Sequence, residues 1–295
     1  MYEAVGPIKP INVQSTKQKM KSYSHSPGSL ILAGLVGLSA LLTVLTLVFI
    51  VGYILIKGIP NLTPELFQLE YNSENVSMFP AIINTICMTA LSLLIAGPLG
   101  ILAAVYLVEY AKKGNKLVSL VRVTAETLTG IPSIVYGLFG MLFFVTTLKW
   151  GYSMLAGAFT LAIMVLPVIM RTTEEALLSV PDTFREASFG LGAGRLRTIF
   201  VVILPSAVPG IFSGVILSIG RIVGETAALM YTAGTVAELP KSVISSTRTL
   251  SVHMYSLASE GLYVNQAYAT AVVLLLIVLL INWVSGRIAR KIKKG

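Results

Sequence analysis

Long apolar segments constrain this sequence more than any other feature. A helix needs about 20 mostly apolar residues to cross the hydrocarbon core of a membrane. Six segments approach or exceed that length, at about 30–56, 80–108, 123–148, 155–170, 206–236 and 267–286. Only 12% of the 295 residues are charged, roughly half the share of a typical soluble domain. The sequence therefore predicts an all-α, polytopic membrane protein with six transmembrane helices.

Two of these segments contain residues that interrupt helices. The third holds Gly130-Ile131-Pro132, where we expect a break, and the second holds Gly97-Pro98. Such interruptions are tolerated in a membrane where neighbouring helices or a cavity satisfy the freed backbone groups. The fourth segment is short, and we expect its helix to continue beyond Arg171.

The Lys and Arg residues predict the orientation. With the N-terminus inside, the inner segments hold 17 of them and the outer segments only four, Lys57, Lys149, Lys241 and Arg248. Cytoplasmic loops carry the excess of basic residues, so both termini are expected in the cytoplasm. Residues 1–28 are polar and predict a disordered cytoplasmic tail. Because the positive charge lies in short loops between spans, it does not indicate nucleic-acid binding.

The inner loop 171–205 shows strong local signals. Pro181 predicts a short helix over Glu174–Val180 that ends before it, and Thr183 with Glu186 fits a capping box that starts a second helix ending near Gly190. Gly190, Gly192 and Gly194 would supply tight or left-handed conformations, and Arg195–Leu204 would lead to Pro205 and the fifth span. Two interpretations stay open: a rigid docking element or a solvated connector.

Two full charges, Arg221 and Glu225, lie inside the fifth apolar segment, "SIGRIVGETAAL". Two independent charges at the centre of a spanning helix would cost about 5–7 kcal/mol. At a spacing of four residues they would share one helix face. They predict either an internal ion pair with a structural role or part of a substrate pathway. The third segment repeats the spacing with Arg122 and Glu126, where Arg122 also fits an anchor at the membrane interface.

The sequence lacks three common motifs of nucleotide-binding proteins and hydrolases. The sequence has no G-x-x-x-x-G-K-[ST] phosphate loop, no H-E-x-x-H and no G-x-S-x-G. We therefore expect no catalytic residue, no metal site and no ATP site in this chain. Energy for transport would come from another chain or from an ion gradient.

The inner loop resembles the EAA loop of ABC importer permeases. "EAS" at 186–188, Gly192 and "VILP" at 202–205 match that pattern in spacing, with Ser188 and Val202 as departures. In that family the short helix docks on a cytoplasmic ATPase. The resemblance implies coupling residues here, namely Thr183, Glu186, Ala187, Gly192 and Pro205.

Three further stretches, "GIPSIVYGLFG", "GRIVGETAAL" and "TLSVHMYSLASEG", resemble the PstA family of phosphate importer permeases over about residues 80–290. The resemblance implies the type I ABC importer architecture in a bacterial cytoplasmic membrane. Residues 29–79 would form the first helix and an outer loop, and 80–290 the permease core. It implies a PstC-like second permease, an ATPase dimer that holds ATP and Mg, and an extracytoplasmic phosphate-binding protein. This chain would bind no cofactor itself.

A phosphate path would suit these residues, because arginine offers a planar, permanently charged fork of donors to phosphate oxygens. The expected pathway residues are Arg221, Glu225, Thr226, Glu126 and Ser133, with Thr129 as a further neutral donor. Alternatives remain: a PstC-like permease or one for another oxyanion, a gradient-driven transporter or channel, and a structural membrane scaffold.

Overall fold

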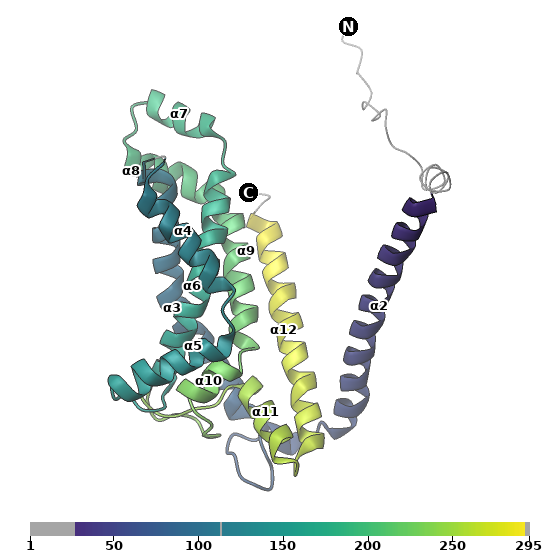
Figure 1. Cartoon of the computed structure of the whole chain (residues 1–295). Coiled ribbons are helices and arrows are strands. Elements are labelled where there is room, and N and C mark those ends of the chain that lie inside the picture. The colour runs from purple at the N-terminus through teal and green to yellow at the C-terminus, as the bar shows by residue number, and fades with distance from the viewer. Residues whose placement is uncertain (1–26, 113, 293–295) are drawn as a thin grey trace. The chain divides into compact units, whose positions relative to one another are not determined.

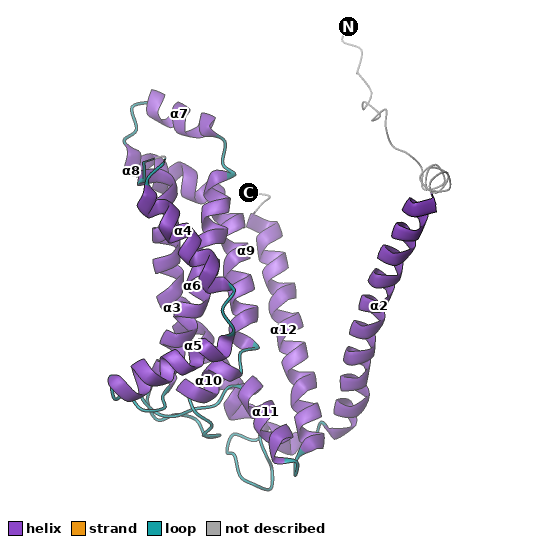
Figure 2. Ribbon diagram, in the orientation of Figure 1, coloured by secondary structure: helices purple, strands orange, loops and turns teal. Residues whose placement is uncertain are grey.

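A computed structural model describes residues 27–112 and 114–292, and these residues form helices and loops without a strand (Figure 2). The longer helices are α2 (Pro27–Gly58), α3 (Phe79–Val105), α4 (Lys116–Thr129), α5 (Ser133–Gly140), α6 (Met154–Leu178), α7 (Asp182–Gly190), α9 (Leu204–Val223), α11 (Leu250–Glu260) and α12 (Val264–Ile292). The shorter ones are η1 (Ile59–Asn61), η2 (Pro64–Phe67), η3 (Tyr106–Tyr110), η4 (Met141–Thr147), α8 (Arg195–Arg197), η5 (Thr198–Ile203) and α10 (Ala227–Thr232). The chain divides into two compact units, Met1–Ile54 and Leu55–Gly295.

The described part of the first unit belongs to α2. Its hydroxyl groups bond within the helix, as Ser39 and Thr43 donate to carbonyl oxygens four residues earlier at 2.9 Å. An apolar helix of this length needs no other partner for its backbone. It confirms the first predicted span. The predicted disordered tail, residues 1–28, lies almost entirely outside the described residues.

The second unit is a helix bundle with α6 at its centre (Figure 1). α3 and α9 pack against α6, and α12 packs against α9 and α11. Large side chains fill the space between α3, α6 and the α9–α10 region without exposure above 1%: Met88, Leu161, Met164, Ile169, Ile222 and Leu229. Most residues of α6 are buried, on several faces of the helix, which explains why its sequence is almost continuously apolar before Arg171.

Among the described residues, five helices are long and apolar enough to cross a membrane, and a bent pair makes a possible sixth. That pair joins α4 to α5 and η4, with a 103° bend at Gly130-Ile131-Pro132, so the predicted break is confirmed. α3 instead continues through Pro98, which loses one hydrogen bond but stays helical. α6 runs on past Arg171, as predicted, to Leu178.

Two sequence predictions about helix ends are wrong. Glu174–Val180 is no separate helix, because residues 174–178 form the last turns of α6. The fifth span does not reach residue 236: its helix starts earlier, at Arg195, and ends at Val223. Gly224 stops it, since glycine is a poor helix former, and α10 follows only after two more residues.

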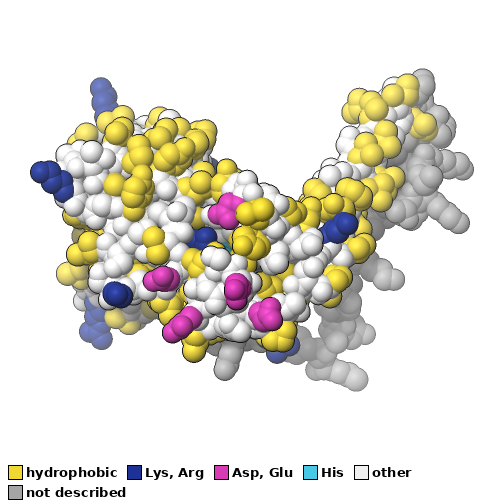
Figure 3. All heavy atoms as spheres, turned by 90° about the horizontal axis from the view of Figure 1, so that it is seen from below, with side chains coloured by type: hydrophobic (Ala, Val, Ile, Leu, Met, Phe, Trp, Pro, Cys, Tyr) yellow, Lys and Arg dark blue, Asp and Glu magenta, His cyan; other side chains and the backbone are white. Residues whose placement is uncertain are grey.

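The two ends of the second unit differ in charge. One end carries α7 and α8, and the opposite end carries α11 (Figure 1). Acidic side chains gather on the face seen from the α11 end (Figure 3). The segment between α2 and α3, the loop before α11 and the last residue of α11 hold exposed glutamates, Glu65, Glu70, Glu74, Glu238 and Glu260. The α7 end carries exposed basic residues, among them Lys112, Lys116, Arg195 and Arg197.

Candidate functional site

Two helix breaks lie at the centre of the candidate site. The C-cap residue of α4 is Gly130, with φ −85° and ψ −9°, and that of α9 is Gly224, with φ −84° and ψ −6°. The half-helices that follow, α5 and α10, pack against each other. A Cβ atom on Gly137 would come within 2.8 Å of the Ala228 Cα, so the glycine allows this close approach. The two spans thus bring their breaks to one region of the bundle.

Arg221 lies in the last turn of α9 beside this region. It is half-buried, and within the described residues its guanidinium forms neither an ion pair nor a hydrogen bond. The charge of Arg221 interacts with the hydroxyl group of Tyr136 in α5. That hydroxyl donates a hydrogen bond to the Leu128 carbonyl oxygen at 2.7 Å. A cation in the last turn also interacts favourably with the helix dipole.

The predicted pairing of Arg221 with Glu225 is wrong. Glu225 lies beyond the end of α9, so the two residues do not share a helix face. Its Oε1 accepts a hydrogen bond from the Ala228 amide at 3.1 Å, and its carbonyl oxygen accepts one from the Ser251 hydroxyl at 2.6 Å. The buried Glu225 thus caps the start of α10 and ties the break to α11.

Thr226 and Ser133 stand at the starts of the two half-helices. Thr226 is the N-cap residue of α10, and its hydroxyl is 3.4 Å from the Gly224 carbonyl oxygen. Ser133 is the first residue of α5 and is half-buried. Both hydroxyls therefore lie in the region of the breaks.

Glu126 belongs to a separate charged cluster between α4 and α6. Arg171 reaches Glu126 at 3.4 Å and Glu175 at 3.2 Å, and Arg122 reaches Glu174 at 2.6 Å. These side chains line a cavity of about 310 Å³. In the described residues no hydrogen bond or ion pair joins Glu126 to Arg221. Arg122 and Glu126 each pair with a residue of α6, Glu174 and Arg171 respectively.

The predicted docking helix exists as α7, but its start differs from the prediction. Its N-cap residue is Pro181, and no side chain caps it, so the capping box of Thr183 with Glu186 is wrong. Proline already fixes the φ angle before the first helical residue, Asp182. Glu186 and Ala187 are exposed.

Of the three glycines predicted to end α7 in tight or left-handed conformations, one has a left-handed backbone. Gly192 has φ +80°, the left-handed conformation that ends a helix, whereas Gly190 and Gly194 have negative φ. Ser188, which replaces the second alanine of the EAA pattern, is buried and hydrogen-bonds to Thr198 at 2.8 Å. Pro205 stands at the start of α9, directly after the π-helical η5.

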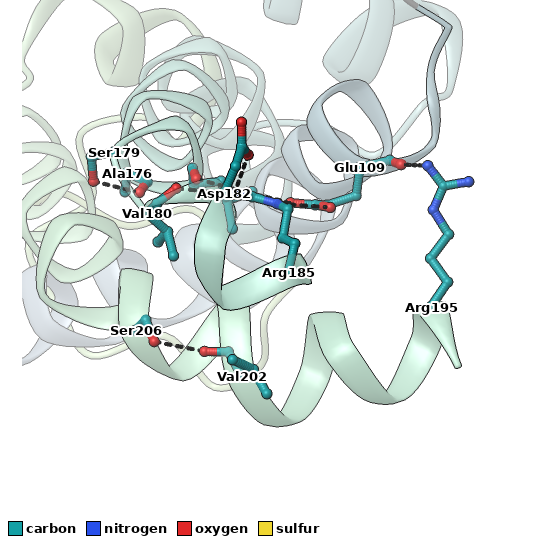
Figure 4. A network of polar contacts seen from close by, with 10 residues as sticks. Glu109, Ala176, Ser179, Val180, Asp182, Arg185, Arg195, Val202 and Ser206 are labelled. Carbon is teal, nitrogen blue, oxygen red and sulfur yellow. Dashed lines mark hydrogen bonds and ion pairs between the residues drawn. The ribbon is translucent and has the colours of Figure 1, made fainter. Parts of the chain in front are cut away.

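A buried ion pair that the sequence did not reveal holds the α7 segment in place (Figure 4). Arg185 Nη2 lies 2.7 Å from Glu109 Oε1, and the same guanidinium donates to the carbonyls of Val180 at 2.9 Å and Leu177 at 3.1 Å. Arg195 donates to the Glu109 carbonyl and stacks over Tyr110. Glu109 directly follows the second apolar segment, and this position is the only feature of the sequence that marks Glu109 out.

A second buried cation lies toward the α11 end. Arg248 is 5% exposed and stacks over the Tyr71 ring at 4.7 Å, while its Nε and Nη2 find no hydrogen-bond partner in the described chain. His253 is fully buried beside it, and burial together with the charge of Arg248 lowers its pKa to about 3. Both residues looked like ordinary loop positions in the sequence.

The described residues contain no group of three or more His, Cys, Asp or Glu side chains that could hold a metal ion. The site therefore consists of an unpaired arginine at two helix breaks, a charged cavity between α4 and α6, and an anchored helix α7.

Comparisons with known proteins show which family the chain belongs to. The model of the family described as binding-protein-dependent transport system inner membrane component matches residues 96–294. The probable ABC transporter permease protein YqgI of Bacillus subtilis is 34% identical over 281 residues, which are 88% of this chain and 95% of that protein. The phosphate transport system permease protein PstA of Pasteurella multocida is 38% identical over 240 residues, 80% and 85% of the two chains.

A solved structure shares the fold. A chain of a bacterial alginate ABC transporter, in complex with a periplasmic protein bound to an alginate pentasaccharide, superposes with a TM-score of 0.68 at 17% identity. The superposition covers 92% of this chain and 98% of that one. The fold is accordingly that of type I ABC importer permeases. The chain belongs to the family of binding-protein-dependent transport system inner membrane components.

Proposed function

We propose that this chain is a transmembrane permease subunit of an ATP-driven phosphate importer and forms half of the translocation path. One observation carries the proposal: the guanidinium of Arg221, which has no hydrogen-bond or ion-pair partner among the described residues, lies where α9 ends, close to the bent span of α4 and α5. The 38% identity to a protein named phosphate transport system permease protein PstA supports phosphate as the substrate.

The chemistry of Arg221 fits a passing phosphate. Its planar donors match two phosphate oxygens, and it keeps its charge at any physiological pH. The hydroxyls of Ser133 and Thr226 add neutral donors at the starts of α5 and α10. Glu225 is engaged with the Ala228 amide and does not hold the arginine fork. Its negative charge near the path limits affinity for anions, which a path needs because substrate must leave.

Glu126 would act at a later stage. With Arg171 it lines the charged cavity between α4 and α6. There the arginine can exchange a carboxylate partner for a phosphate oxygen, and the carboxylate can take it back after release. In this proposal, the anion passes from the helix breaks to that cavity before it leaves.

The α7 segment would couple the path to a separate ATPase dimer. α7 and its flanks expose Phe184, Leu191 and Leu196, apolar side chains that a partner subunit could cover. Glu186 and Ala187 stand on the exposed part of α7, and Gly192 shapes its end. ATP and Mg would bind to that partner, since this sequence has no phosphate loop and would bind no cofactor of its own.

The remaining partners and the orientation follow from the same assignment. A PstC-like permease would supply the other half of the path, and an extracytoplasmic phosphate-binding protein would deliver substrate at the α11 end. The α7 end and both termini would be cytoplasmic in a bacterial cytoplasmic membrane, because basic residues concentrate on that side. Family membership favours this ATP-driven system over a gradient-driven one.

Uptake by the reconstituted complex in vesicles tests the proposal. Phosphate should be taken up in preference to sulfate and molybdate, and only with ATP. Arg221→Gln should lower phosphate uptake about tenfold or more while the complex still assembles, because a charged hydrogen-bond donor is lost. Arg287→Gln is the matched control, since Arg287 stacks on Trp283 at 4.2 Å, on α12.

Three results would contradict parts of it. Normal uptake by Arg221→Gln would leave Arg221 a structural role only. Preference for sulfate would overturn the substrate. Uptake that follows an ion gradient without ATP would overturn the mechanism.

A further inference from the structure

A basic cavity lies at the start of α4. It has a volume of about 660 Å³, within the range of small-molecule sites, and is formed by the end of η3, the described residues of the following loop, the first turns of α4 and Leu178. Three cationic side chains, Lys112, Lys116 and Arg122, line it, and the described lining contains no acidic residue. Arg122 is already paired with Glu174 at 2.6 Å. The two lysines therefore supply the free positive charge.

Polar groups of this cavity favour a phosphate group. Ser119 contributes a hydroxyl to the lining. The cavity also borders the N-terminus of a helix of 14 residues, whose dipole favours negative charge. The Asn115 side chain caps that helix by accepting from the Leu117 amide at 2.9 Å, which leaves the lysines and Ser119 for a ligand. These groups together suit an anion with several acceptor oxygens.

Apolar side chains line the cavity beside these cations. They are Leu107, Val108, Val118 and Leu178. A free phosphate ion makes no use of apolar surface, whereas an amphiphile with an anionic head uses both parts. Basic pockets between membrane helices are suited to phospholipid headgroups.

We propose that this cavity binds the phosphate headgroup of an anionic phospholipid, with the start of its acyl chains against the apolar part of the lining. The shared chemistry is a phosphate group, and free inorganic phosphate is the other possible source. The site does not depend on phosphate being the transported substrate. It also adjoins Glu109, since Leu107 and Val108 belong to the same turns of η3. A bound lipid would brace the helix end that holds the α7 segment.

Native mass spectrometry of the purified complex tests the site, with phosphatidylglycerol and phosphatidylcholine as probes. Wild type should retain phosphatidylglycerol over phosphatidylcholine. Lys112→Gln with Lys116→Gln should weaken that retention about fivefold per lysine removed. Lys149→Gln with Lys241→Gln is the matched control with the same charge loss, and it should retain lipid like wild type. Conversion of both site lysines to arginine should also preserve retention.

Two further experiments test whether the cavity itself, and not surface charge alone, binds the ligand, and whether that ligand is a lipid or free phosphate. Ser119→Phe fills the cavity without changing charge and should also reduce retention, with unaltered complex assembly. Addition of millimolar inorganic phosphate should leave phosphatidylglycerol bound. Equal retention by wild type and the double glutamine variant would overturn the site. Unaltered retention by Ser119→Phe would overturn the cavity, and displacement by inorganic phosphate would overturn the lipid.

Discussion

Arg185 and Glu109 join the α7 segment to the end of the second span, with 2.7 Å between Nη2 and Oε1 and side chains only 15% and 9% exposed. The same guanidinium also donates hydrogen bonds to the carbonyl oxygens of Leu177, in the last turn of α6, and of Val180. One side chain thus fixes α7 against two different spans. Any force applied to α7 by a partner subunit would reach α6 and η3 through this contact.

Loss of the Glu109 charge should therefore loosen the α7 segment. In Glu109→Gln the guanidinium of Arg185 stays buried without its carboxylate, which typically costs about 3–5 kcal/mol. We expect faster proteolysis within residues 182–197 and ATP hydrolysis that no longer produces uptake. Asp182→Asn is the matched control, because Asp182 pairs with Arg185 at 3.1 Å but is 85% exposed. Similar behaviour of the two variants would show that burial of the pair has no role.

Acid should weaken the α11 end through His253. Its folded-state pKa of about 3 lies below the ordinary value of 6.5, because burial and then Arg248 disfavour the charged ring. The unfolded chain therefore binds more protons between these values, and stability is full above pH about 6.5 and falls as pH drops toward 3. The slope for this one group is at most about 1.4 kcal/mol per pH unit.

Thermal unfolding of the purified complex between pH 8 and pH 5 measures this effect. His253→Leu should flatten the dependence below pH 6.5, and His25→Gln should leave it unchanged. An equal slope in His253→Leu and wild type would assign the acid sensitivity to other groups.

The packing of α5 on α10 should be intolerant of a single methyl group. A Cβ on Gly137 would lie 2.8 Å from the Ala228 Cα, a backbone atom that cannot rotate away. Gly137→Ala should force the half-helices apart at a cost of about 1–3 kcal/mol and reduce uptake. Gly97→Ala in α3, where nothing lies within 4 Å of the added atom, is the control and should be neutral or stabilising. Equal unfolding temperatures for both would contradict the close approach.

Much of the fold could be predicted because membrane spans carry a local signal. The lengths of the apolar segments predicted the spans, and Gly130-Ile131-Pro132 predicted the bend. The end of α9 was missed because Gly224 interrupts a run that remains apolar on both sides, so hydropathy alone continued the helix. Whether a glycine inside an apolar segment ends a helix cannot be decided until its packing is known.

The candidate site was less predictable, since its contacts join distant residues. Spacing within one helix suggested that Arg221 and Glu225 pair, yet the break sends Glu225 to the Ala228 amide. Glu109 meets Arg185 across 76 positions of the chain, which no local pattern encodes. Gly192, in contrast, was predicted correctly because its requirement is local.

That local requirement leads to a sharp test of the coupling segment. Gly192 has φ +80°, a region that costs other residues about 1–2 kcal/mol, while Gly190 has an ordinary helical conformation. Neither glycine has any atom within 4 Å of an added Cβ, so the two positions differ in backbone conformation rather than in available space. Gly192→Ala should therefore distort the end of α7 and lower both co-purification with the ATPase and uptake. Gly190→Ala should leave both unchanged, and Gly192→Asn should restore part of the loss because asparagine tolerates the left-handed region. Equal loss in both alanine variants would mean that side-chain bulk on the docking face, and not the left-handed turn, decides coupling.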